Sequence, residues 1–328
     1  MDQALTAAAE LNGGFFTRAQ ALDRGWTDRD LGTACRLGIL RHIRHGAYAP
    51  AGTYDAATEA VRHLVLARAA LARQRGSVAL TGVSAAAAHG LCVFGHDLTT
   101  ADLVRLDSGS SRQEVRTRHH VVRDDIAQHI EMVAGIPATS LARTVWEVAG
   151  RSSLEAGVAT VDSALRLNPQ LADELAAMAP TFASRPGSRR AREAVRLADG
   201  RAESPGESYS RVKFYRCGVP MPALQHPVLD ADGKLIGICD FYWEDDHHVG
   251  EFDGKIKYGR LLRSGESPGD GVFREKRRED RVRAQLLGMS RWVFADLSTT
   301  QVKDFITRLN AERARSRALY GRSRAILV

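Results

Sequence analysis

Four residues that could act on a phosphate ester lie close together in the sequence: Asp240, Glu251, Asp253 and Lys255. The last three alternate in the stretch VGEFDGKIKYG, so in a β-strand their side chains would face one side. Carboxylates hold Mg²⁺ or Mn²⁺, which polarises a phosphoryl oxygen and lowers the pKa of a bound water. A nearby ammonium stabilises the charge that develops as the phosphate is attacked. The spacing predicts metal-dependent phosphodiester cleavage, with Asp240, Glu251 and Asp253 as metal ligands and Lys255 as the cation.

Two further polar residues are candidates for the same site. Glu207 lies near the start of a predicted helix and could complete the acidic cluster, and Gln225 on a neighbouring strand could orient a water. Glu207 also has the spacing of a capping-box residue, three positions after Ser204. The alternative interpretation of the Glu251 stretch is a solvated edge strand. The sequence leaves open whether Glu251 or Asp253 is the essential acid.

The elements that must position these residues follow one another between residues 203 and 300. Ser204 as N-cap and Pro205 at the first helical position predict a helix that ends by Gly218. Two strand-like runs around an Asp-Gly turn predict a hairpin, and the Glu251 stretch predicts a third strand. The basic run FREKRREDRVRAQLLG predicts a helix, and SRWVFADL a closing strand. The predicted order is helix, three strands, helix, strand.

That order, with an acid near the end of the second strand and D-x-K near the end of the third, resembles the restriction-endonuclease-like pattern. The pieces SPGES, PALQ, GICDFYW, EFDGK and EKRREDRVRAQLLG resemble nuclease-like domains akin to very-short-patch repair endonucleases. The resemblance implies a PD-(D/E)xK fold with a mixed central sheet and a DNA substrate. No His closely follows the motif, unlike in the repair enzymes. Lys257 and, on the basic helix, Lys276 and Arg278 are expected to contact phosphates.

Residues 1–50 have the pattern of a winged helix-turn-helix. Three short helices, two of them with Thr N-caps at Thr17 and Thr27, precede the alternating run ILRHIRHGAYAP, which predicts a two-stranded wing. The stretch from Gly13 to Pro50 resembles the N-terminal winged helix of AbiEi-type antitoxins, which implies a cytoplasmic DNA-binding autorepressor. Docking of a protein is the alternative role. The residues expected to contact DNA are Arg29, Arg36, Arg41 and Arg44.

The rest of the chain shows no catalytic pattern. Residues 51–182 are predicted to form a mostly helical scaffold or dimerisation domain, and SAAAAHGL and PATSLARTVWEVA resemble the middle of AbiEi-like proteins. A homodimer is therefore a candidate assembly. Residues 183–202 are predicted to form a linker helix and residues 301–328 a basic C-terminal helix or tail. The predicted fold class is α+β.

The charge, hydropathy and cysteine spacing of the chain indicate what kind of partner and environment to expect. The 328 residues carry a net charge of +7, and most of the excess lies after Lys255, which favours a polyanionic partner. No apolar run is long enough to span a bilayer, and the start of the chain does not resemble a signal peptide, so we expect a cytoplasmic protein without a membrane partner. The four cysteines form no C-x-x-C pair, which argues against a disulfide framework or a structural zinc site.

The sequence thus favours a DNA-binding protein with a Mg²⁺-dependent endonuclease domain that acts on duplex DNA, in phage defence or a toxin–antitoxin setting. The alternative is an AbiEi-type antitoxin and transcriptional repressor, with a cognate toxin as partner and an inert nuclease fold. A third interpretation is a docking module of a defence complex without activity of its own.

Overall fold

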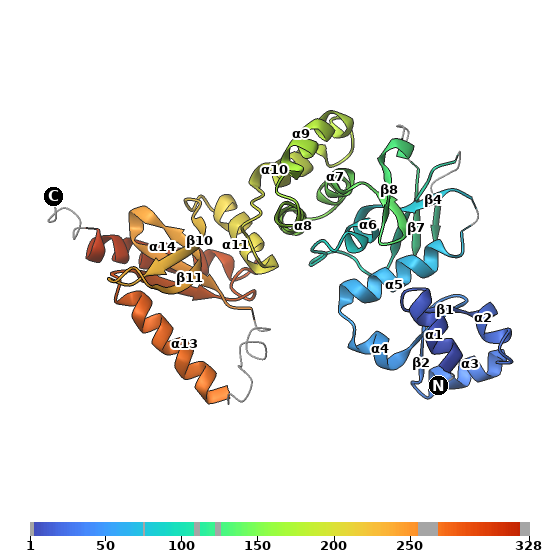
Figure 1. Ribbon diagram of the computed structural model, residues 1–328. Helices are drawn as coiled ribbons and strands as arrows, with labels where there is room; N and C mark the ends of the chain where they lie inside the picture. Colours follow the sequence, from blue (N-terminus) through green and yellow to red (C-terminus); the bar gives the residue numbers. More distant parts are fainter. Residues whose placement is uncertain (1–2, 75, 108–111, 122–125, 255–267, 322–328) are drawn as a thin grey trace. The chain divides into compact units, whose positions relative to one another are not determined.

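The computed structural model describes residues 3–74, 76–107, 112–121, 126–254 and 268–321 (Figure 1). The chain divides into two compact units, Met1–Ala164 with Asn168–Arg196, and Leu165–Leu167 with Leu197–Val328. Helices and mixed sheets build both units, so the predicted α+β class is confirmed. Among the described residues, no helix combines the length and hydropathy needed to cross a membrane.

The first unit begins with a small helical bundle closed by a sheet. Its elements are α1 (Gln3–Leu11), β1 (Phe16–Thr17), α2 (Arg18–Leu22), α3 (Asp28–Arg36), β2 (Leu40–Arg44) and β3 (Ala47–Pro50). The strands form an antiparallel sheet in the order β1-β3-β2. Thr17 and Thr27 each make the predicted capping box, which fixes where α2 and α3 begin. Leu5, Phe16 and Leu31 are buried in the core of this bundle.

A six-stranded sheet forms the centre of the first unit. Its order is β6-β7-β5-β4-β9-β8, and the β5–β7 and β4–β9 pairs are parallel. The strands are β4 (Val78–Leu80), β5 (Ala101–Arg105), β6 (Arg112–Glu114), β7 (Thr117–His120), β8 (Ile130–Val133) and β9 (Ile136–Thr139). Residues Phe15 and Ile43 of the N-terminal bundle share a core with Leu66, Leu80 and Leu103, so the bundle and the sheet are one packed body.

Helices complete the first unit. They are α4 (Ala51–Ala56), α5 (Glu59–Leu71), α6 (Gly82–Ala88), α7 (Leu141–Arg151), α8 (Leu154–Leu167), α9 (Leu171–Phe182) and α10 (Ser188–Leu197), with a 3-10 turn at Ile126–His129. Helices α5 and α6 pack against β5, and α7 packs against α6 and α9. The last residues of α8 are grouped with the second unit.

The second unit has the predicted order of helix, three strands, helix and strand. Its elements are α11 (Pro205–Arg216), β10 (Ala223–Leu229), β11 (Leu235–Trp243), the 3-10 turn Glu244–Asp246, β12 (His248–Phe252), α13 (Pro268–Arg283), β13 (Gly288–Trp292) and α14 (Val302–Tyr320). The sheet order is β10-β11-β12-β13; the first two pairs are antiparallel and β12–β13 is parallel. The predicted mixed sheet is therefore present.

Each face of this sheet is covered by helices. An aromatic core that includes Phe214, Phe241, Trp292 and Phe305 joins one face to α11 and α14. Cys239, Val249 and Met289 face the other way and pack with Val282 of α13. The strand ends that carry the predicted acids are consequently held between α11 and α13.

Candidate functional site

Glu207 is fixed at the start of α11. Its carboxylate accepts hydrogen bonds from the Glu203 backbone N–H at 2.9 Å and from the Ser204 hydroxyl at 2.6 Å. Glu207 thus takes part in the start of α11, although it accepts the N–H of the residue before the N-cap and not that of Ser204 as a full capping box would, and the residue is only 2% exposed. Helix α11 lies tightly against the end of β12, since a Cβ added at Gly206 would come within 1.9 Å of the Phe252 ring.

Gln225 and Asp240 lie on the strands next to this helix start. Gln225 donates from Nε2 to Glu207 Oε2 at 2.9 Å, and its backbone has φ +53°, a left-handed conformation rare outside glycine. Asp240 Oδ2 accepts the Phe252 N–H at 2.8 Å, which ties β11 to the end of β12. The structure thus gathers Glu207, Gln225 and Asp240 around the segment that ends in Phe252.

Glu251 is the most strongly paired of the predicted acids. Arg278 of α13 lies 2.5 Å and Arg291 of β13 lies 2.9 Å from its two carboxylate oxygens. Glu251 and Arg291 are direct partners in the parallel β12–β13 ladder. Burial, together with the smaller effect of the Glu251 charge, raises the pKa of the neighbouring Cys239 thiol to about 12. Glu251 is therefore the centre of a two-arginine ion-pair cluster, which we call the Glu251 cluster.

In the structure, the three predicted metal ligands have other partners. Glu251 binds two arginines, Asp240 binds a backbone amide, and Asp253 donates its own N–H to the Trp292 carbonyl at 2.8 Å. Within the part of the chain that the structure describes, no group of three or more His, Cys, Asp or Glu residues could hold a metal ion. We therefore derive no catalytic step through a metal ion. Lys255 and Lys257 lie outside the described residues.

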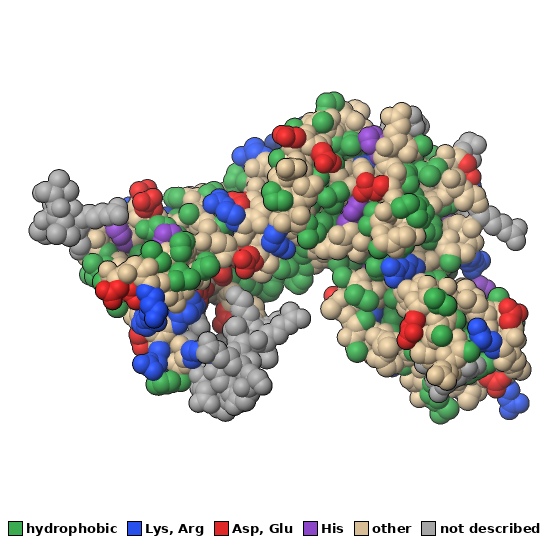
Figure 2. Space-filling model, in the orientation of Figure 1, with side chains coloured by type: hydrophobic (Ala, Val, Ile, Leu, Met, Phe, Trp, Pro, Cys, Tyr) green, Lys and Arg blue, Asp and Glu red, His purple; other side chains and the backbone are tan. Residues whose placement is uncertain are grey.

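Sequence reasoning missed Arg291 and assigned Arg278 to a phosphate contact instead of an ion pair. The sequence did carry a signal for Arg291. It is the single charged residue inside the closing strand GMSRW, and a charge there needs a partner on the adjacent strand. Lys276, in contrast, is exposed as predicted. Figure 2 shows Lys and Arg side chains gathered over α13.

The four arginines predicted for the N-terminal region have different surroundings. Arg29 and Arg36 are exposed on α3. Arg41 forms a two-point ion pair with Asp55, with its closer contact at 2.7 Å. The prediction that Arg44 is presented on the wing is wrong: its side chain is 4% exposed and lies 3.9 Å from Glu114. Because β2 packs against α5, the Arg44 side chain points into the unit and donates to the Ala69 carbonyl at 3.4 Å, and burial lowers the pKa of its guanidinium.

Two acids on α3 that flank Arg29 are both engaged. Arg18 pairs with Asp28 through two contacts of 2.6 Å, and this ion pair lowers the pKa of the Asp28 carboxyl. Asp30 accepts from the Thr27 N–H at 2.8 Å and from the Thr27 hydroxyl at 2.6 Å, which lowers the pKa of Asp30. Both acidic side chains of α3 thus have a nearby partner.

Comparison with known proteins finds similarity to proteins that are uncharacterized. No family model matches it. Two curated proteins of Mycobacterium tuberculosis, the uncharacterized proteins Rv2248 of strain H37Rv and MT2308 of strain CDC 1551, are each 33% identical over 181 residues. That span is 54% of this chain and 62% of each relative. The crystal structure of the RV2827C protein from the same species covers 69% of this chain and 87% of its own, at 17% identity and a TM-score of 0.36.

Proposed function

We propose that this chain binds duplex DNA through a winged helix formed by residues 1–50. The observation that carries the proposal is the element order α1, β1, α2, α3, β2, β3 with the three strands in one small antiparallel sheet. In helix-turn-helix proteins the second helix of the motif enters the major groove. Helix α3 corresponds to that recognition helix, and the β2–β3 hairpin corresponds to the wing.

The charges on α3 support this role. Arg29 and Arg36 are exposed, whereas Asp28 is paired with Arg18 and Asp30 caps its own helix. An approaching phosphate therefore meets two arginines whose flanking acids already have partners. Contacts of this kind fix a protein on the duplex without reading bases directly.

Fluorescence anisotropy of the full chain with a labelled duplex tests the proposal. We expect binding to weaken steeply with salt, because each phosphate contact releases counterions. The double variant Arg29→Ala/Arg36→Ala should reduce the slope of log affinity against log salt by about 2, since each contact contributes about 0.9. Arg192→Ala, an exposed arginine on α10, is the matched control and should leave the slope unchanged. Equal slopes for the double variant and the wild-type protein would exclude α3 as the DNA-binding helix and leave protein docking, for example of a cognate toxin, as its role.

Phosphodiester cleavage by the second unit is a second candidate function. It is favoured by the order α11, β10, β11, β12, α13, β13 with a parallel β12–β13 pair, the order of restriction-endonuclease-like folds. Asp240, Glu207 and Gln225 lie beside the end of β12, and Lys276 and Arg277 are exposed on α13. The Glu251 cluster favours the inert alternative, because two cations already neutralise the acid.

Nicking of supercoiled plasmid by the full chain, in Mg²⁺, in Mn²⁺ and in chelator, separates the two alternatives. The cleavage proposal expects nicking in one of the two ions, loss of nicking in Asp240→Asn, and no effect of Asp232→Asn in the exposed β10–β11 turn. A wild-type protein that binds plasmid but leaves it intact under every condition would contradict cleavage and support a nuclease fold used only for binding.

A further inference from the structure

Three exposed basic residues of the first unit lie beside the turn of the β2–β3 hairpin. His45 lies in that turn, Arg73 follows the end of α5, and Arg116 lies in the turn between β6 and β7. We call these three residues the wing-flank surface. Arg73 and Arg116 lie outside residues 1–50, but their elements belong to the body that shares a core with the N-terminal bundle. The surface therefore continues from the hairpin onto the central sheet and its helices.

A hollow of about 330 Å³ lies between the hairpin turn and the end of α5. His45 and Arg73 line it together with small residues such as Ala72, and none of the described residues that line it is acidic. Arg73 makes no hydrogen bond or ion pair within the described part of the chain. The nearest stretches of the sequence outside the described ranges, Arg75 and residues 108–111, contain no acid. The hollow thus presents basic groups that an anion can reach.

Arg116 is fixed on the other side of the hairpin. Its backbone has φ +58°, a left-handed conformation that is rare and costly for a residue other than glycine and is often found at functional positions. Its guanidinium donates from Nε to the Thr99 carbonyl at 3.3 Å and from Nη1 to the Ile43 carbonyl of β2. The side chain is nevertheless exposed. Its other N–H groups therefore form an ordered planar donor beside the hairpin.

A buried arginine adds positive charge beneath this surface. The Nε atom of Arg44 has no hydrogen-bond partner among the described residues, and the Glu114 carboxylate lies 3.9 Å from its guanidinium. Burial, together with the smaller effects of the Arg73 and Arg116 charges, lowers the pKa of Arg44, whereas Glu114 acts in the opposite direction. Like charges held this close repel one another in the free protein, and a bound anion offsets the repulsion.

The acids close to Arg116 have cations beside them. Asp55 forms a two-point ion pair with Arg41. Glu59 lines a second hollow, of about 320 Å³, in which Arg62 and Arg116 are also lining residues. The positive charge of the wing-flank surface is therefore not cancelled by either of these acids.

We propose that the wing-flank surface binds the phosphate backbone of duplex DNA beside the segment contacted by α3. The inference rests on the proposed function of residues 1–50 and extends the DNA-binding face onto the central part of the first unit. Duplex DNA fits because its phosphates form a continuous row of anions, and the basic groups come from three separate elements of one packed body. The planar N–H groups of an arginine bind two phosphate oxygens at once. Such contacts position the duplex without reading its sequence.

Fluorescence anisotropy of the full chain with a labelled duplex, measured over a series of salt concentrations, tests the surface. Arg73→Ala should reduce the slope of log affinity against log salt by about 1, because one phosphate contact is lost, and Arg73→Ala/Arg116→Gln should reduce it by about 2. Arg73→Ala should not melt below the wild-type temperature, because Arg73 has no hydrogen bond or ion pair to lose.

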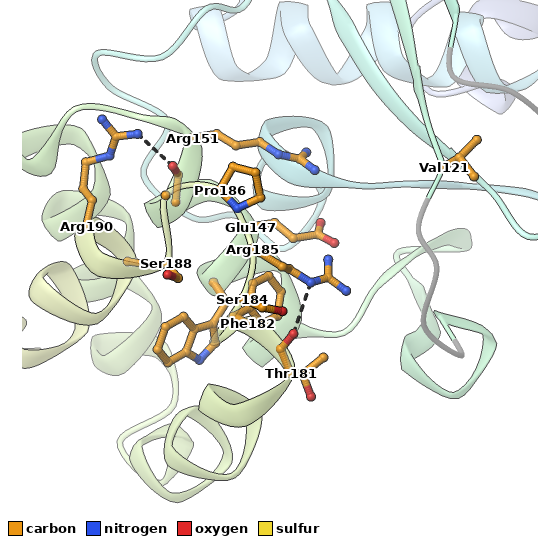
Figure 3. Close-up of a pocket in the computed structure, with 14 residues that line it drawn as sticks. Val121, Glu147, Arg151, Thr181, Phe182, Ser184, Arg185, Pro186, Ser188 and Arg190 are labelled. Atoms are coloured by element: carbon orange, nitrogen blue, oxygen red, sulfur yellow. Dashed lines mark hydrogen bonds between the residues drawn. The ribbon is translucent and has the colours of Figure 1, made fainter.

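Arg151→Ala is the matched control. Arg151 is also an exposed arginine of the first unit, but it lines a different pocket, formed by α7, the end of α9 and the loop before α10 (Figure 3). Its removal should leave the slope unchanged. Equal slopes for Arg73→Ala, Arg151→Ala and the wild-type protein would overturn the inference.

The variant Arg29→Ala/Arg36→Ala separates this inference from the proposed function. A lower slope in that variant, with a wild-type slope in Arg73→Ala, overturns the wing-flank surface and keeps α3 as the DNA-binding helix. The reverse result overturns the role of α3 and keeps the wing-flank surface as a DNA contact. A wild-type protein that binds no duplex overturns both.

Photocrosslinking gives a second readout that does not depend on salt. Val115 is 85% exposed and precedes Arg116 in the β6–β7 turn, whereas Met132 is 68% exposed on β8, at the opposite edge of the six-stranded sheet. p-Benzoylphenylalanine in place of Val115 should crosslink to the bound duplex, and the same replacement of Met132 should not. Absence of a crosslink from position 115, or equal crosslinking from both positions, would contradict the proposal.

Discussion

At the scale of single residues, the buried pair Arg143–Glu147 has the largest expected effect on stability. The two residues are one helical turn apart on α7, 0% and 3% exposed, and joined at 3.0 Å. Burial of an ion pair contributes little on balance, but removal of one member leaves the other charge buried without its partner. Glu147 also binds the start of α6 through the Gly82 N–H, so the pair connects two helices.

Arg143→Met should therefore lower the free energy of unfolding of the first unit by about 3–5 kcal/mol. Replacement of both residues, as Arg143→Met/Glu147→Gln, should cost clearly less than the sum of the two single changes, because neither charge is then left alone. Urea denaturation of the three variants and the wild-type chain measures both quantities. Additive losses would show that the two side chains act independently.

The residue scale is also where prediction from the sequence was least complete. The types of Glu207, Gln225 and Asp240 indicated one polar site, and the structure places them around the end of β12. The partners of Glu251 were not predicted, because Arg291 reaches it through the parallel pairing of β12 with β13 and Arg278 reaches it from α13, and both contacts depend on tertiary packing. Arg44 was misjudged for a similar reason: alternation along a strand does not reveal which face a helix such as α5 will cover.

At the scale of elements, the start of α11 shows how a helix is placed against a strand. Ser204 and Glu207 exchange hydrogen bonds across the first turn, and Gly206 allows the helix backbone to reach the Phe252 ring. Such capping sites were readable from the sequence, as were the hairpin around Asp232-Gly233 and the order of elements in the second unit. Short strands such as Val78–Leu80 were not, because three apolar residues carry no period.

Gly206→Ala should destabilise the second unit by about 1–3 kcal/mol, the usual cost of overpacking, because the new methyl would lie 1.9 Å from a ring atom of the buried Phe252. Gly254→Ala is the matched control, since its Cβ would lie at an ordinary 3.8 Å from the same ring. Thermal unfolding followed by tryptophan fluorescence compares them, because Trp243 and Trp292 lie in this core. Equal stability of the two variants would mean that α11 can shift away from β12 at no cost.

At the scale of the whole molecule, two separately packed units imply two responses to solution conditions. In the second unit, His248 joins three elements: its ring nitrogens lie 2.8 Å from the Ser316 hydroxyl of α14 and 2.7 Å from the Ser290 hydroxyl of β13. Burial and, to a smaller extent, the nearby Arg313 charge lower the pKa of His248 to about 4, while Asp246 acts in the opposite direction. The ring is therefore neutral in the folded protein at neutral pH.

Because the unfolded chain binds a proton at His248 near pH 6.5 and the folded unit only near pH 4, stability should fall as the pH drops through that window. Between pH 7.5 and pH 5 the loss due to this residue is about 2 kcal/mol. His248→Gln should be less stable at pH 7.5 but should show a smaller decline toward pH 5. Denaturant unfolding of the second unit at both pH values measures the difference, and parallel declines in the two proteins would contradict it.

The parallel pairing of β12 with β13 also determines when the second unit can form during synthesis. His248 and Gly288 are ladder partners although forty residues separate them, and the intervening chain includes the whole of α13. A contact over such a separation requires closure of a long loop, which costs conformational entropy before the strand pairing contributes any stability. Once residues 1–196 have emerged from the ribosome, the main part of the first unit is complete, whereas the carboxylate-bearing strand β12 has only β11 as a partner until β13, ending at Trp292, has emerged. We therefore expect the nascent chain to hold one finished unit and one incomplete sheet edge, the state in which it is most exposed to proteases and to pairing with other chains.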